Sequence, residues 1–215
     1  MSVPEPTIQI VDDDELFLAS ISRLLRASGF AVTTFSSASA LLAACDADAP
    51  GCVLADLQMP GMNGLDLQAA LARTRNPLPI LFLTGHGDIP SSVRAMREGA
   101  VDFLEKRAPK EHLLDAVKRA LARDARDRAE RARLRELQAR FDTLTARELE
   151  VLSHVVRGQL NKQIAADLGI HERSVKRHRT AVTTKLGVQS VAELTQLSLE
   201  GGIFTVPPST VPKGL

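Results

Sequence analysis

The chain has little aromatic character and few cysteines. Aromatic residues make up 3% of its 215 residues, with no tryptophan and no tyrosine. A platform of aromatic rings for stacking single-stranded nucleic acid is therefore a poor expectation. The two cysteines, Cys45 and Cys52, form no Cys-x-x-Cys pair. This spacing argues against a zinc site or a disulfide framework and favours a reducing compartment.

Long hydrophobic runs are also missing. No stretch reaches the roughly 18 apolar residues of a membrane-spanning helix, so we expect no membrane partner. The opening residues, MSVPEPTIQIVDDDE, lack a basic segment followed by an apolar one, and we expect no secretory signal. Together these absences predict a cytoplasmic protein.

The net charge of +1 conceals an uneven distribution. Residues 1–122 hold 11 Lys and Arg against 15 Asp and Glu, a balance of −4. Residues 123–140 hold 7 against 4 (+3), and residues 141–215 hold 9 against 7 (+2). An acidic front and a basic rear predict two modules, and the rear module is the candidate for an anionic partner.

Short apolar runs alternate with amphipathic stretches through the first half of the chain. The runs predict five strands, at Ile8–Val11, Ala31–Phe35, Val53–Leu57, Ile80–Thr84 and Val101–Leu104. The helical patterns between them cover Leu16–Ala27, Ala38–Ala47, Leu65–Arg73, Ile89–Glu98 and the residues from Leu113 onward. This alternation predicts an α/β doubly wound domain with a five-stranded parallel sheet over residues 1–122.

The second half reads as helical throughout. From Lys110 to about Arg140 the sequence has no Gly or Pro, so we predict one long helix whose residues 123–142 form a linker. A solvated helix and a coiled-coil spacer that sets dimer geometry are equally open interpretations of this linker. After it, four short helices are predicted over residues 143–202, the first opened by a capping box of Thr145 and Glu148. Residues 203–215 contain three prolines and are expected to be disordered.

Charged and hydroxyl side chains lie at the predicted strand ends, where parallel α/β sheets bind ligands. Asp12 and Asp13 end the first strand, Asp56 the third and Thr84 the fourth, and Lys106 follows the fifth. Each residue alone has an equally good structural interpretation, such as a helix cap. Together they predict clustered carboxylates that favour Mg²⁺, with a carboxylate able to attack phosphorus beside a neutralising lysine.

The motifs VDDDE, ADLQMPGMNGLDL, FLTGHGDI and GAVDFLEK resemble the receiver domain of two-component response regulators over residues 7–122. The resemblance implies a flavodoxin-like fold and Asp56 as the phosphoacceptor. It also implies that Asp12, Asp13, Asp56 and the backbone carbonyl of Gln58 hold Mg²⁺. In the loop after Asp56, Pro60, Gly61 and Gly64 match the family's turn.

The same resemblance assigns three further residues. Lys106 would pair with the phosphoryl oxygens, Thr84 would close on them, and Phe103 would be the switch aromatic that turns inward. The sequence departs from the family after Lys106, where Arg107 replaces the usual proline. A cis bond before a non-proline residue costs about 3–4 kcal/mol, so we expect a trans bond there. This bond would re-aim the loop and weaken switching, unless Pro109 restores a similar geometry.

Residues 143–200 resemble the LuxR-type helix-turn-helix domain of the NarL/FixJ subfamily, through LTARELEVL, GQLNKQIAADLGIHERSVKRHRTAVTTKLGV and SVAEL. A short helix, a glycine turn and a helix with a basic face suit the major groove of DNA. Val175 and Val182 are expected to face the domain core. The candidate DNA contacts are Asn161, Lys162, Ser174, Lys176, Arg177, His178, Arg179 and Lys185.

Two questions about these contacts stay open in the sequence. Lys and Arg can bind phosphates or read guanine edges, and binding is expected to depend on Lys176 and Arg179. His178 can equally be a base reader or a buried or capping histidine.

The function predicted from these resemblances is a response regulator that accepts a phosphoryl group from a sensor histidine kinase. As a phosphorylation-promoted homodimer it would bind promoter DNA, with RNA polymerase as a further partner. It would be no enzyme beyond its own phosphorylation and dephosphorylation. One alternative is a haloacid-dehalogenase-like phosphatase, which needs a second Asp where this chain has Gln58. Another is an interaction protein whose basic domain contacts RNA or protein.

Overall fold

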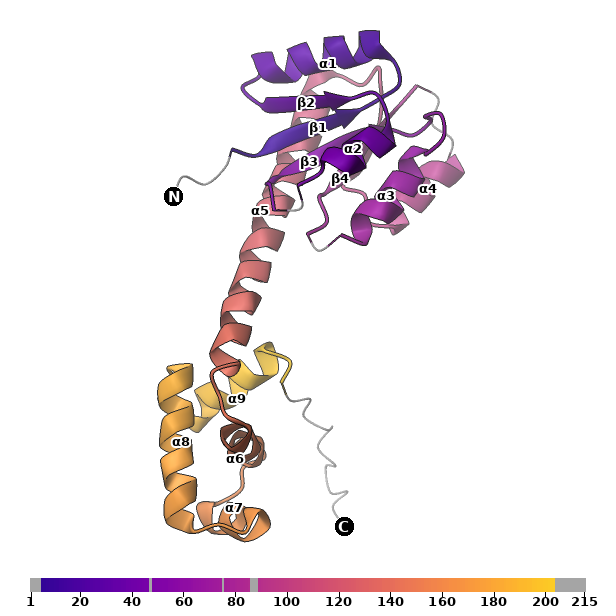
Figure 1. Cartoon of the computed structure of the whole chain (residues 1–215). Coiled ribbons are helices and arrows are strands. Elements are labelled where there is room, and N and C mark those ends of the chain that lie inside the picture. Colours follow the sequence, from indigo (N-terminus) through magenta and orange to yellow (C-terminus); the bar gives the residue numbers. More distant parts are fainter. Residues whose placement is uncertain (1–4, 47, 75, 86–88, 204–215) are drawn as a thin grey trace, which may run out of the picture. The chain divides into compact units, whose positions relative to one another are not determined.

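The structure is a computed structural model that describes residues 5–46, 48–74, 76–85 and 89–203. It divides into two compact units, residues 1–129 and residues 130–215 (Figure 1). Among the described residues, no helix combines the length and the apolar character needed to cross a membrane.

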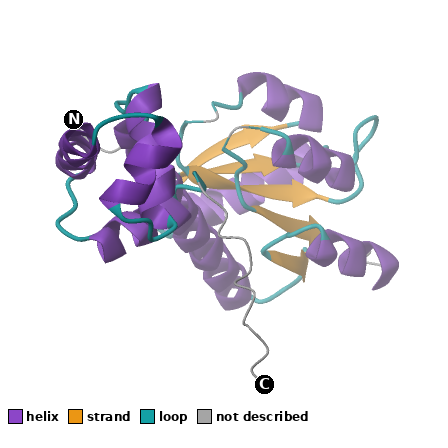
Figure 2. Cartoon of the chain, turned by 90° about the horizontal axis from the view of Figure 1, so that it is seen from below, coloured by secondary structure: helices purple, strands orange, loops and turns teal. Residues whose placement is uncertain are grey.

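The first unit is built on five parallel strands in the order β2-β1-β3-β4-β5. The strands are β1 (Thr7–Val11), β2 (Ala31–Phe35), β3 (Gly51–Asp56), β4 (Ile80–Thr84) and β5 (Asp102–Glu105). The helices between them are α1 (Glu15–Ala27), α2 (Ala38–Ala44), α3 (Gly64–Ala72), α4 (Ile89–Arg97) and α5 (Lys110–Phe141). The predicted doubly wound fold is confirmed, with helices on both faces of the sheet (Figure 2).

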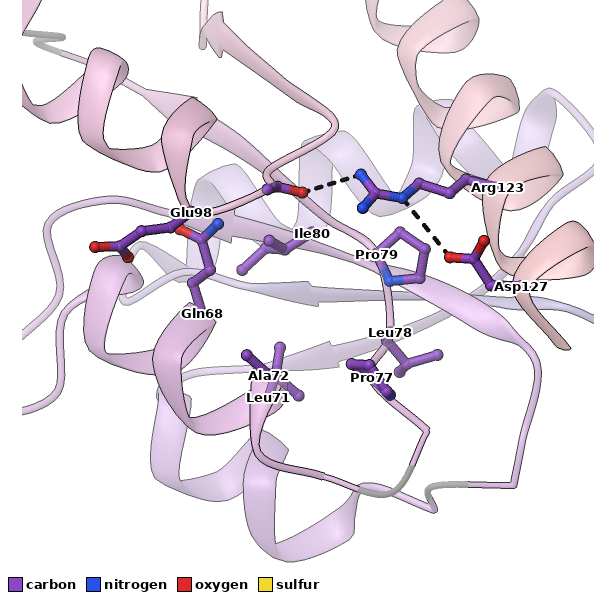
Figure 3. A pocket seen from close by; sticks show the side chains of 11 residues that line it. Gln68, Leu71, Ala72, Pro77, Leu78, Pro79, Ile80, Glu98, Arg123 and Asp127 are labelled. Atoms are coloured by element: carbon purple, nitrogen blue, oxygen red, sulfur yellow. Dashed lines mark hydrogen bonds and ion pairs between the residues drawn. The ribbon is translucent and has the colours of Figure 1, made fainter. Parts of the chain in front are cut away.

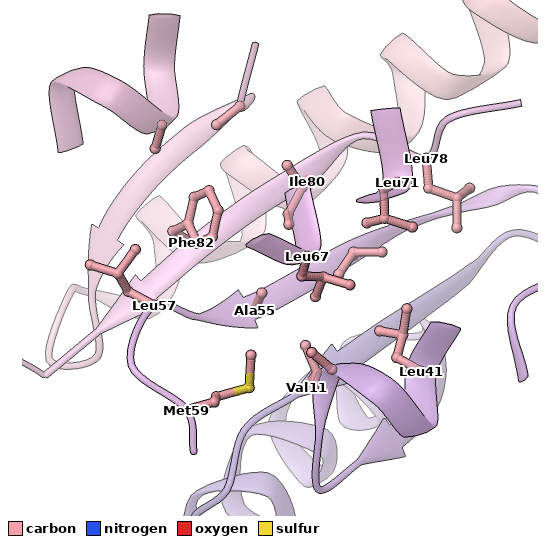
Figure 4. Close-up of a cluster of buried hydrophobic side chains, with 14 residues drawn as sticks. Val11, Leu41, Ala55, Leu57, Met59, Leu67, Leu71, Leu78, Ile80 and Phe82 are labelled. Carbon is pink, nitrogen blue, oxygen red and sulfur yellow. The ribbon is translucent and has the colours of Figure 1, made fainter. Parts of the chain in front are cut away.

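Two buried clusters lie on the two faces of this sheet. One joins alternate strand residues to α2, α3 and α4 through Leu41, Leu67 and Ala95 (Figure 4). The other joins the intervening strand residues to α1 and α5, for example through Leu25 and Val117. Because side chains alternate between the faces of a strand, a strand covered on both faces reads as a continuous apolar run.

Some predicted element bounds were wrong by one to three residues. The third strand begins at Gly51 and ends at Asp56 rather than at Leu57, and the fifth covers Asp102–Glu105. The second helix ends at Ala44 because Cys45 adopts an extended conformation, with ψ at 114°. Residue 47, its predicted end, lies outside the described residues.

The predicted linker is a continuous part of α5, and the first unit extends along this helix to Ala129. Asp124 is buried, and its Oδ2 accepts hydrogen bonds from the Gly51 amide (2.9 Å) and from Arg128 Nε (2.7 Å). Arg128 also donates to the carbonyl oxygens of Asp48 and Ala49. These contacts hold α5 against the start of β3 beyond residue 122, the predicted end of the first domain.

The second unit contains the end of α5 and four shorter helices. These are α6 (Ala146–Val156), α7 (Asn161–Leu168), α8 (Glu172–Leu186) and α9 (Val191–Glu200), as predicted for an all-α domain. Thr145 and Glu148 form the expected capping box, and Gly169 and Gly187 end α7 and α8 in left-handed conformations. The unit has its own core, which includes Phe141 and Leu152. Residues 204–215 of the predicted tail lie outside the described residues.

Candidate functional site

The strand register brings three carboxylates together at the carboxyl edge of the sheet. Val11 at the end of β1 pairs with Ala55 of β3, so that Asp12 and Asp56 follow side by side. Oxygen atoms of Asp12, Asp13 and Asp56 all lie within 4.8 Å of one another. Asp12 and Asp56 are buried, whereas Asp13 is exposed. Three carboxylate oxygens at this spacing suit a hard divalent cation such as Mg²⁺.

Among the residues that the structure describes, Lys106 is the one positively charged side chain that contacts these carboxylates. Its Nζ lies 2.7 Å from Asp12 Oδ2 and 3.1 Å from Asp56 Oδ2. Its backbone amide donates to the Thr84 carbonyl oxygen at 2.8 Å, which fixes the residue to the end of β4. The sequence-predicted residues Asp12, Asp13, Asp56, Thr84 and Lys106 are therefore collected at one edge from four separate strand ends.

The charges at this edge perturb one another. Burial raises the pKa of Asp12, and this effect outweighs the hydrogen bonds from Lys106 and from the Asp14 amide, which lower it. Burial acts to lower the pKa of Lys106, but hydrogen bonds to Asp12 and Asp56 outweigh it and leave that pKa raised. Lys106 is therefore a fixed positive charge, and the buried Asp12 carboxylate gains from a further cation.

The loop after Asp56 is held close to the sheet. The Leu57 amide donates to Asp56 Oδ1 at 2.7 Å, and the Gly64 amide donates to the Leu57 carbonyl at 2.9 Å. A Cβ on Gly64 would lie 2.5 Å from the Asp56 carbonyl oxygen and 2.8 Å from the Phe82 ring, so only glycine fits. Gln58 is exposed and, together with Asp13, lines a pocket beside the carboxylates. A role for its carbonyl as a metal ligand stays a prediction.

Thr84 and Phe103, the predicted switch residues, lie on adjacent strands. Thr84 is buried at the end of β4. Phe103 pairs with Phe82 across β4 and β5, and the two ring centroids are 6.1 Å apart at an interplanar angle of 44°. The Phe103 side chain is half-buried beside α4, so it has one face in the core and one toward the surface.

The loop after Lys106 has a trans peptide bond and a hydrogen-bonded turn. The described part of the chain contains no cis peptide bond, which confirms the trans bond between Lys106 and Arg107. The Ala108 amide donates to the Glu105 carbonyl at 2.9 Å and closes a turn, after which the Pro109 carbonyl accepts from the first turn of α5. The effect of this loop on switching stays a prediction.

Sequence reasoning missed Phe17 in the first turn of α1. The Lys106 ammonium lies over its ring, with Nζ 4.4 Å from the ring centroid. Because 88 residues lie between Phe17 and Lys106 in the sequence, only the packing of α1 beside the end of β5 brings them together. No local motif could have identified the contact.

A second cavity lies at the opposite edge of the sheet, at the start of β4 (Figure 3). Pro79 and Ile80 line it together with Gln68 of α3 and Arg123 of α5. Arg123 donates to the Gly99 carbonyl at 3.0 Å, and Gln68 Nε2 donates to the Ala95 carbonyl at 3.0 Å. Asp127 pairs with Arg123 at 3.7 Å and Glu98 pairs with Arg94 at 2.9 Å, and none of the lining groups belongs to the carboxylate site.

In the second unit, α8 presents a basic surface. Val175 and Val182 are buried in the domain core, as predicted. Lys176 and Arg177 are exposed, whereas Ser174, His178 and Arg179 are half-buried. Arg173, which the sequence analysis missed, is also exposed one turn before Arg177. The spacing of four residues between two arginines was the signal that could have identified it.

Two of the predicted DNA-contacting cations, Arg179 and Lys185, form hydrogen bonds inside the domain. Arg179 Nη1 donates to Asn161 Oδ1 at 2.8 Å, which ties α8 to the start of α7. Lys185 Nζ donates to Glu148 Oε2 at 2.7 Å and to the Thr143 carbonyl at 3.0 Å. We therefore assign Lys185 a part in holding the domain together. Lys162 is exposed at the start of α7.

Comparisons with known proteins agree with this two-part architecture. Residues 8–118 match the response regulator receiver domain family, and residues 142–198 match the luxR family of bacterial regulatory proteins. The response regulator protein TodT of Pseudomonas putida is 41% identical over 92% of this chain and 87% of its own length. The transcriptional regulatory protein FixJ of Rhizobium meliloti is 39% identical over 91% of this chain and 96% of its own length.

Solved structures give the same result. The response regulator StyR is 43% identical, covers 91% of this chain with 99% of its own, and has a TM-score of 0.81. Full-length FixJ from B. japonicum is 35% identical, covers 94% of this chain with 100% of its own, and has a TM-score of 0.56. The chain is therefore a two-component response regulator of the NarL/FixJ type, with a receiver domain followed by a LuxR-type DNA-binding domain.

Proposed function

We propose that this response regulator is a transcription factor controlled by phosphorylation of Asp56. The observation that carries the proposal is the meeting of Asp12, Asp13, Asp56 and Lys106 at one sheet edge, in a chain that also bears the basic helix α8. The donor is a sensor histidine kinase, and the output is altered binding to promoter DNA. RNA polymerase would be the further partner, in the cytoplasm.

In the proposed reaction an Asp56 carboxylate oxygen attacks the phosphorus of a phosphohistidine. The P–O bond of an acyl phosphate forms as the P–N bond breaks, and the imidazole keeps the electron pair and takes up a proton. Asp12, Asp13, Asp56 and the Gln58 carbonyl would hold Mg²⁺, which when bound neutralises charge on the transferring phosphoryl group. Lys106 places its ammonium beside the attacking carboxylate. We assign the chain no catalysis beyond its own phosphorylation and dephosphorylation.

Phosphorylation would then be read by Thr84 and Phe103. The Thr84 hydroxyl would bind a phosphoryl oxygen at the end of β4, and Phe103 would turn inward toward Phe82. Such a change can shift a population only through contacts that differ between the two states. The half-buried position of Phe103 between the core and α4 supports this role.

The surface that would respond is the groove between α4 and β5. Its exposed apolar side chains are Ile89 (79% exposed), Val93 (43%) and Met96 (46%), and they lie in the groove that Phe103 also lines. Arg97, Asp102 and Glu105 border the same groove. An apolar strip with both charge signs at its margin suits a symmetric contact with a second copy. We therefore propose that the phosphorylated protein dimerises here.

The dimer would present two α8 helices to successive major grooves, at half-sites about one helical turn apart. Lys176 and Arg177, with Arg173, form the exposed cationic face of this helix. Arg179 and Asn161 support the proposed interface through their mutual hydrogen bond, and Lys162 suits a phosphate contact at the start of α7. Ser174 and His178, both half-buried, stay candidate contacts at its margin.

Labelling tests the chemical step. The protein is incubated with acetyl phosphate and Mg²⁺, and the acyl phosphate is located by mass spectrometry. We expect one phosphoryl group, on Asp56, which is lost in Asp56→Asn and in EDTA. Undiminished labelling of the Asp56→Asn variant, or labelling in EDTA, contradicts the assignment.

Binding measurements test the output. The affinity for duplex DNA is measured across a salt series for the wild-type protein, Lys176→Ala and Arg177→Ala. Arg140→Ala, an exposed change on α5, is the control. Loss of a phosphate contact should weaken all sequences alike and lower the salt slope by about 1, whereas loss of a base contact relaxes specificity at one position. Light scattering should show a phosphorylation-dependent dimer. Wild-type affinity in both α8 variants, or RNA preferred over duplex DNA, contradicts the proposed interface.

A further inference from the structure

The Lys106 ammonium has three supports from three different elements. Asp12 after β1 and Asp56 at the end of β3 supply carboxylate oxygens at 2.7 and 3.1 Å. Phe17 of α1 supplies the face of its ring, 4.4 Å from Nζ. The electron-rich face of an aromatic ring attracts a cation, and more strongly where water is partly excluded. The Lys106 side chain is only 19% exposed, so this condition is met.

The three partners of the Lys106 ammonium differ in whether they could still contact it during the proposed reaction. Asp12 and Asp56 are the carboxylates that would hold Mg²⁺, and Asp56 would carry the phosphoryl group. Both carboxylates that contact Lys106 would therefore have other partners when the receiver is loaded. The Phe17 ring binds no metal and carries no titratable group, so it is the support that persists.

Phe17 is itself fixed relative to the carboxylates. Its backbone amide donates to Asp14 Oδ1 at 3.1 Å, as part of the N-terminal cap of α1. The Asp14 amide in turn donates to Asp12 Oδ1 at 3.0 Å. The ring also packs against the buried cluster beneath α1 and α5. Two short hydrogen-bonded links thus connect the ring position to a proposed metal ligand.

We propose that Phe17 is a positioning residue that holds the Lys106 ammonium where it can reach the phosphoryl group on Asp56. The proposal rests on the proposed function and adds to it a residue outside the carboxylate set. A restraint on the Lys106 side chain matters in this chain because Arg107 stands in place of a proline that would stiffen the backbone after Lys106. Hydrogen bonds to the Thr84 carbonyl and within the turn restrain the Lys106 backbone, whereas the ring restrains the far end of its side chain.

Three substitutions separate this role from simple packing. Phe17→Leu keeps an apolar side chain against the cluster but removes the ring face, whereas Phe17→Tyr keeps the ring. Phe30→Leu is the matched control, because Phe30 is also half-buried against the same cluster and has no cation over its ring among the described residues. All variants are made in the full-length chain, and their thermal unfolding is compared first.

Two measurements are then made on each variant. The rate of Asp56 phosphorylation by acetyl phosphate is measured over a range of donor concentrations with saturating Mg²⁺. Separately, the Lys106 Hε resonances are followed by NMR in metal-free protein, where a ring above the side chain shifts them upfield. We expect Phe17→Leu to lower the maximal rate by about three- to tenfold and to abolish the upfield shift. Phe17→Tyr and Phe30→Leu should keep both properties.

A double-mutant cycle tests whether the ring acts through the lysine. In a Lys106→Met background, Phe17→Leu should change the residual labelling rate by less than about twofold. A full additional loss in that background overturns the proposal. So does an unchanged rate in Phe17→Leu, or an equal loss in Phe30→Leu.

Failure of the proposed function would look different. If wild-type Asp56 is not labelled, the phosphoacceptor assignment fails and the positioning role falls with it. If wild-type Asp56 is labelled and Phe17→Leu behaves as wild type, only the positioning role is overturned.

Discussion

Lys185 and Glu148 form an ion pair inside the DNA-binding domain, with Nζ 2.7 Å from Oε2. The same Glu148 oxygen accepts a hydrogen bond from the Thr145 amide at 2.8 Å, as half of the capping box of α6. The last turn of the basic helix α8 is therefore tied to the first turn of α6. The contact uses a cation that the sequence alone would assign to DNA.

Replacing Lys185 by methionine should destabilise this domain by about 1–3 kcal/mol, because Glu148 would stay buried without its charged partner. Lys176→Met is the control, since Lys176 is exposed and its Nζ is 3.7 Å from Glu172. Hydrogen exchange of the α6 and α8 amides in the full-length protein measures the effect. Equal protection in the two variants would refute the structural role of Lys185.

The same contact predicts a pH dependence. The hydrogen bond from Lys185, followed by that from the Thr145 amide, lowers the pKa of Glu148 below its ordinary value of 4.5. A lowered folded-state pKa stabilises the fold above the unfolded pKa, and this stabilisation is lost as the pH falls through the folded value. We expect amide protection in α6 to decline below about pH 4.5, and Glu148→Gln to flatten the decline. A profile identical in wild type and Glu148→Gln would contradict this expectation.

At the other unit, Asp124 and Arg128 hold α5 to the start of β3. Arg128→Ala would leave the buried Asp124 carboxylate without its cation, which we expect to destabilise the receiver domain by about 3 kcal/mol. Arg126→Ala, an exposed change on the same helix, should have little effect. Urea unfolding followed by circular dichroism compares the two. Similar midpoints would show that the Gly51 amide alone stabilises Asp124.

Metal removal should reveal the cost of burying the Asp12 carboxylate. Because burial raises the pKa of Asp12, its charged form costs stability at neutral pH, and this cost is relieved as the pH falls through the raised value. We expect Asp12→Asn to raise the unfolding temperature in EDTA by a few degrees. Mg²⁺ should raise that of the wild type and leave the variant unchanged. Stabilisation of both proteins by Mg²⁺ would place the metal elsewhere.

The sequence determined the elements and the edge at which the site forms. Apolar runs covered on both faces predict parallel strands, and parallel strands bring their carboxyl ends together. Asp12, Asp56, Thr84 and Lys106 could therefore be placed at one edge without coordinates. The capping box at Thr145 and the buried positions of Val175 and Val182 follow from spacings of a few residues, so the sequence predicts them correctly.

The tertiary structure alone decided which side chains meet across long separations. The structure joins the ring of Phe17 to Lys106, the Asp124 carboxylate to the Gly51 amide, and Lys185 to Glu148. These pairs are 89, 73 and 37 positions apart in the sequence. Residue type does not predict these pairs, because a lysine in the sequence looks the same whether its partner is DNA, a carboxylate or an aromatic ring. The packing of helices on the sheet and on one another selects among these partners, since it fixes which charged groups lose water and must find one another.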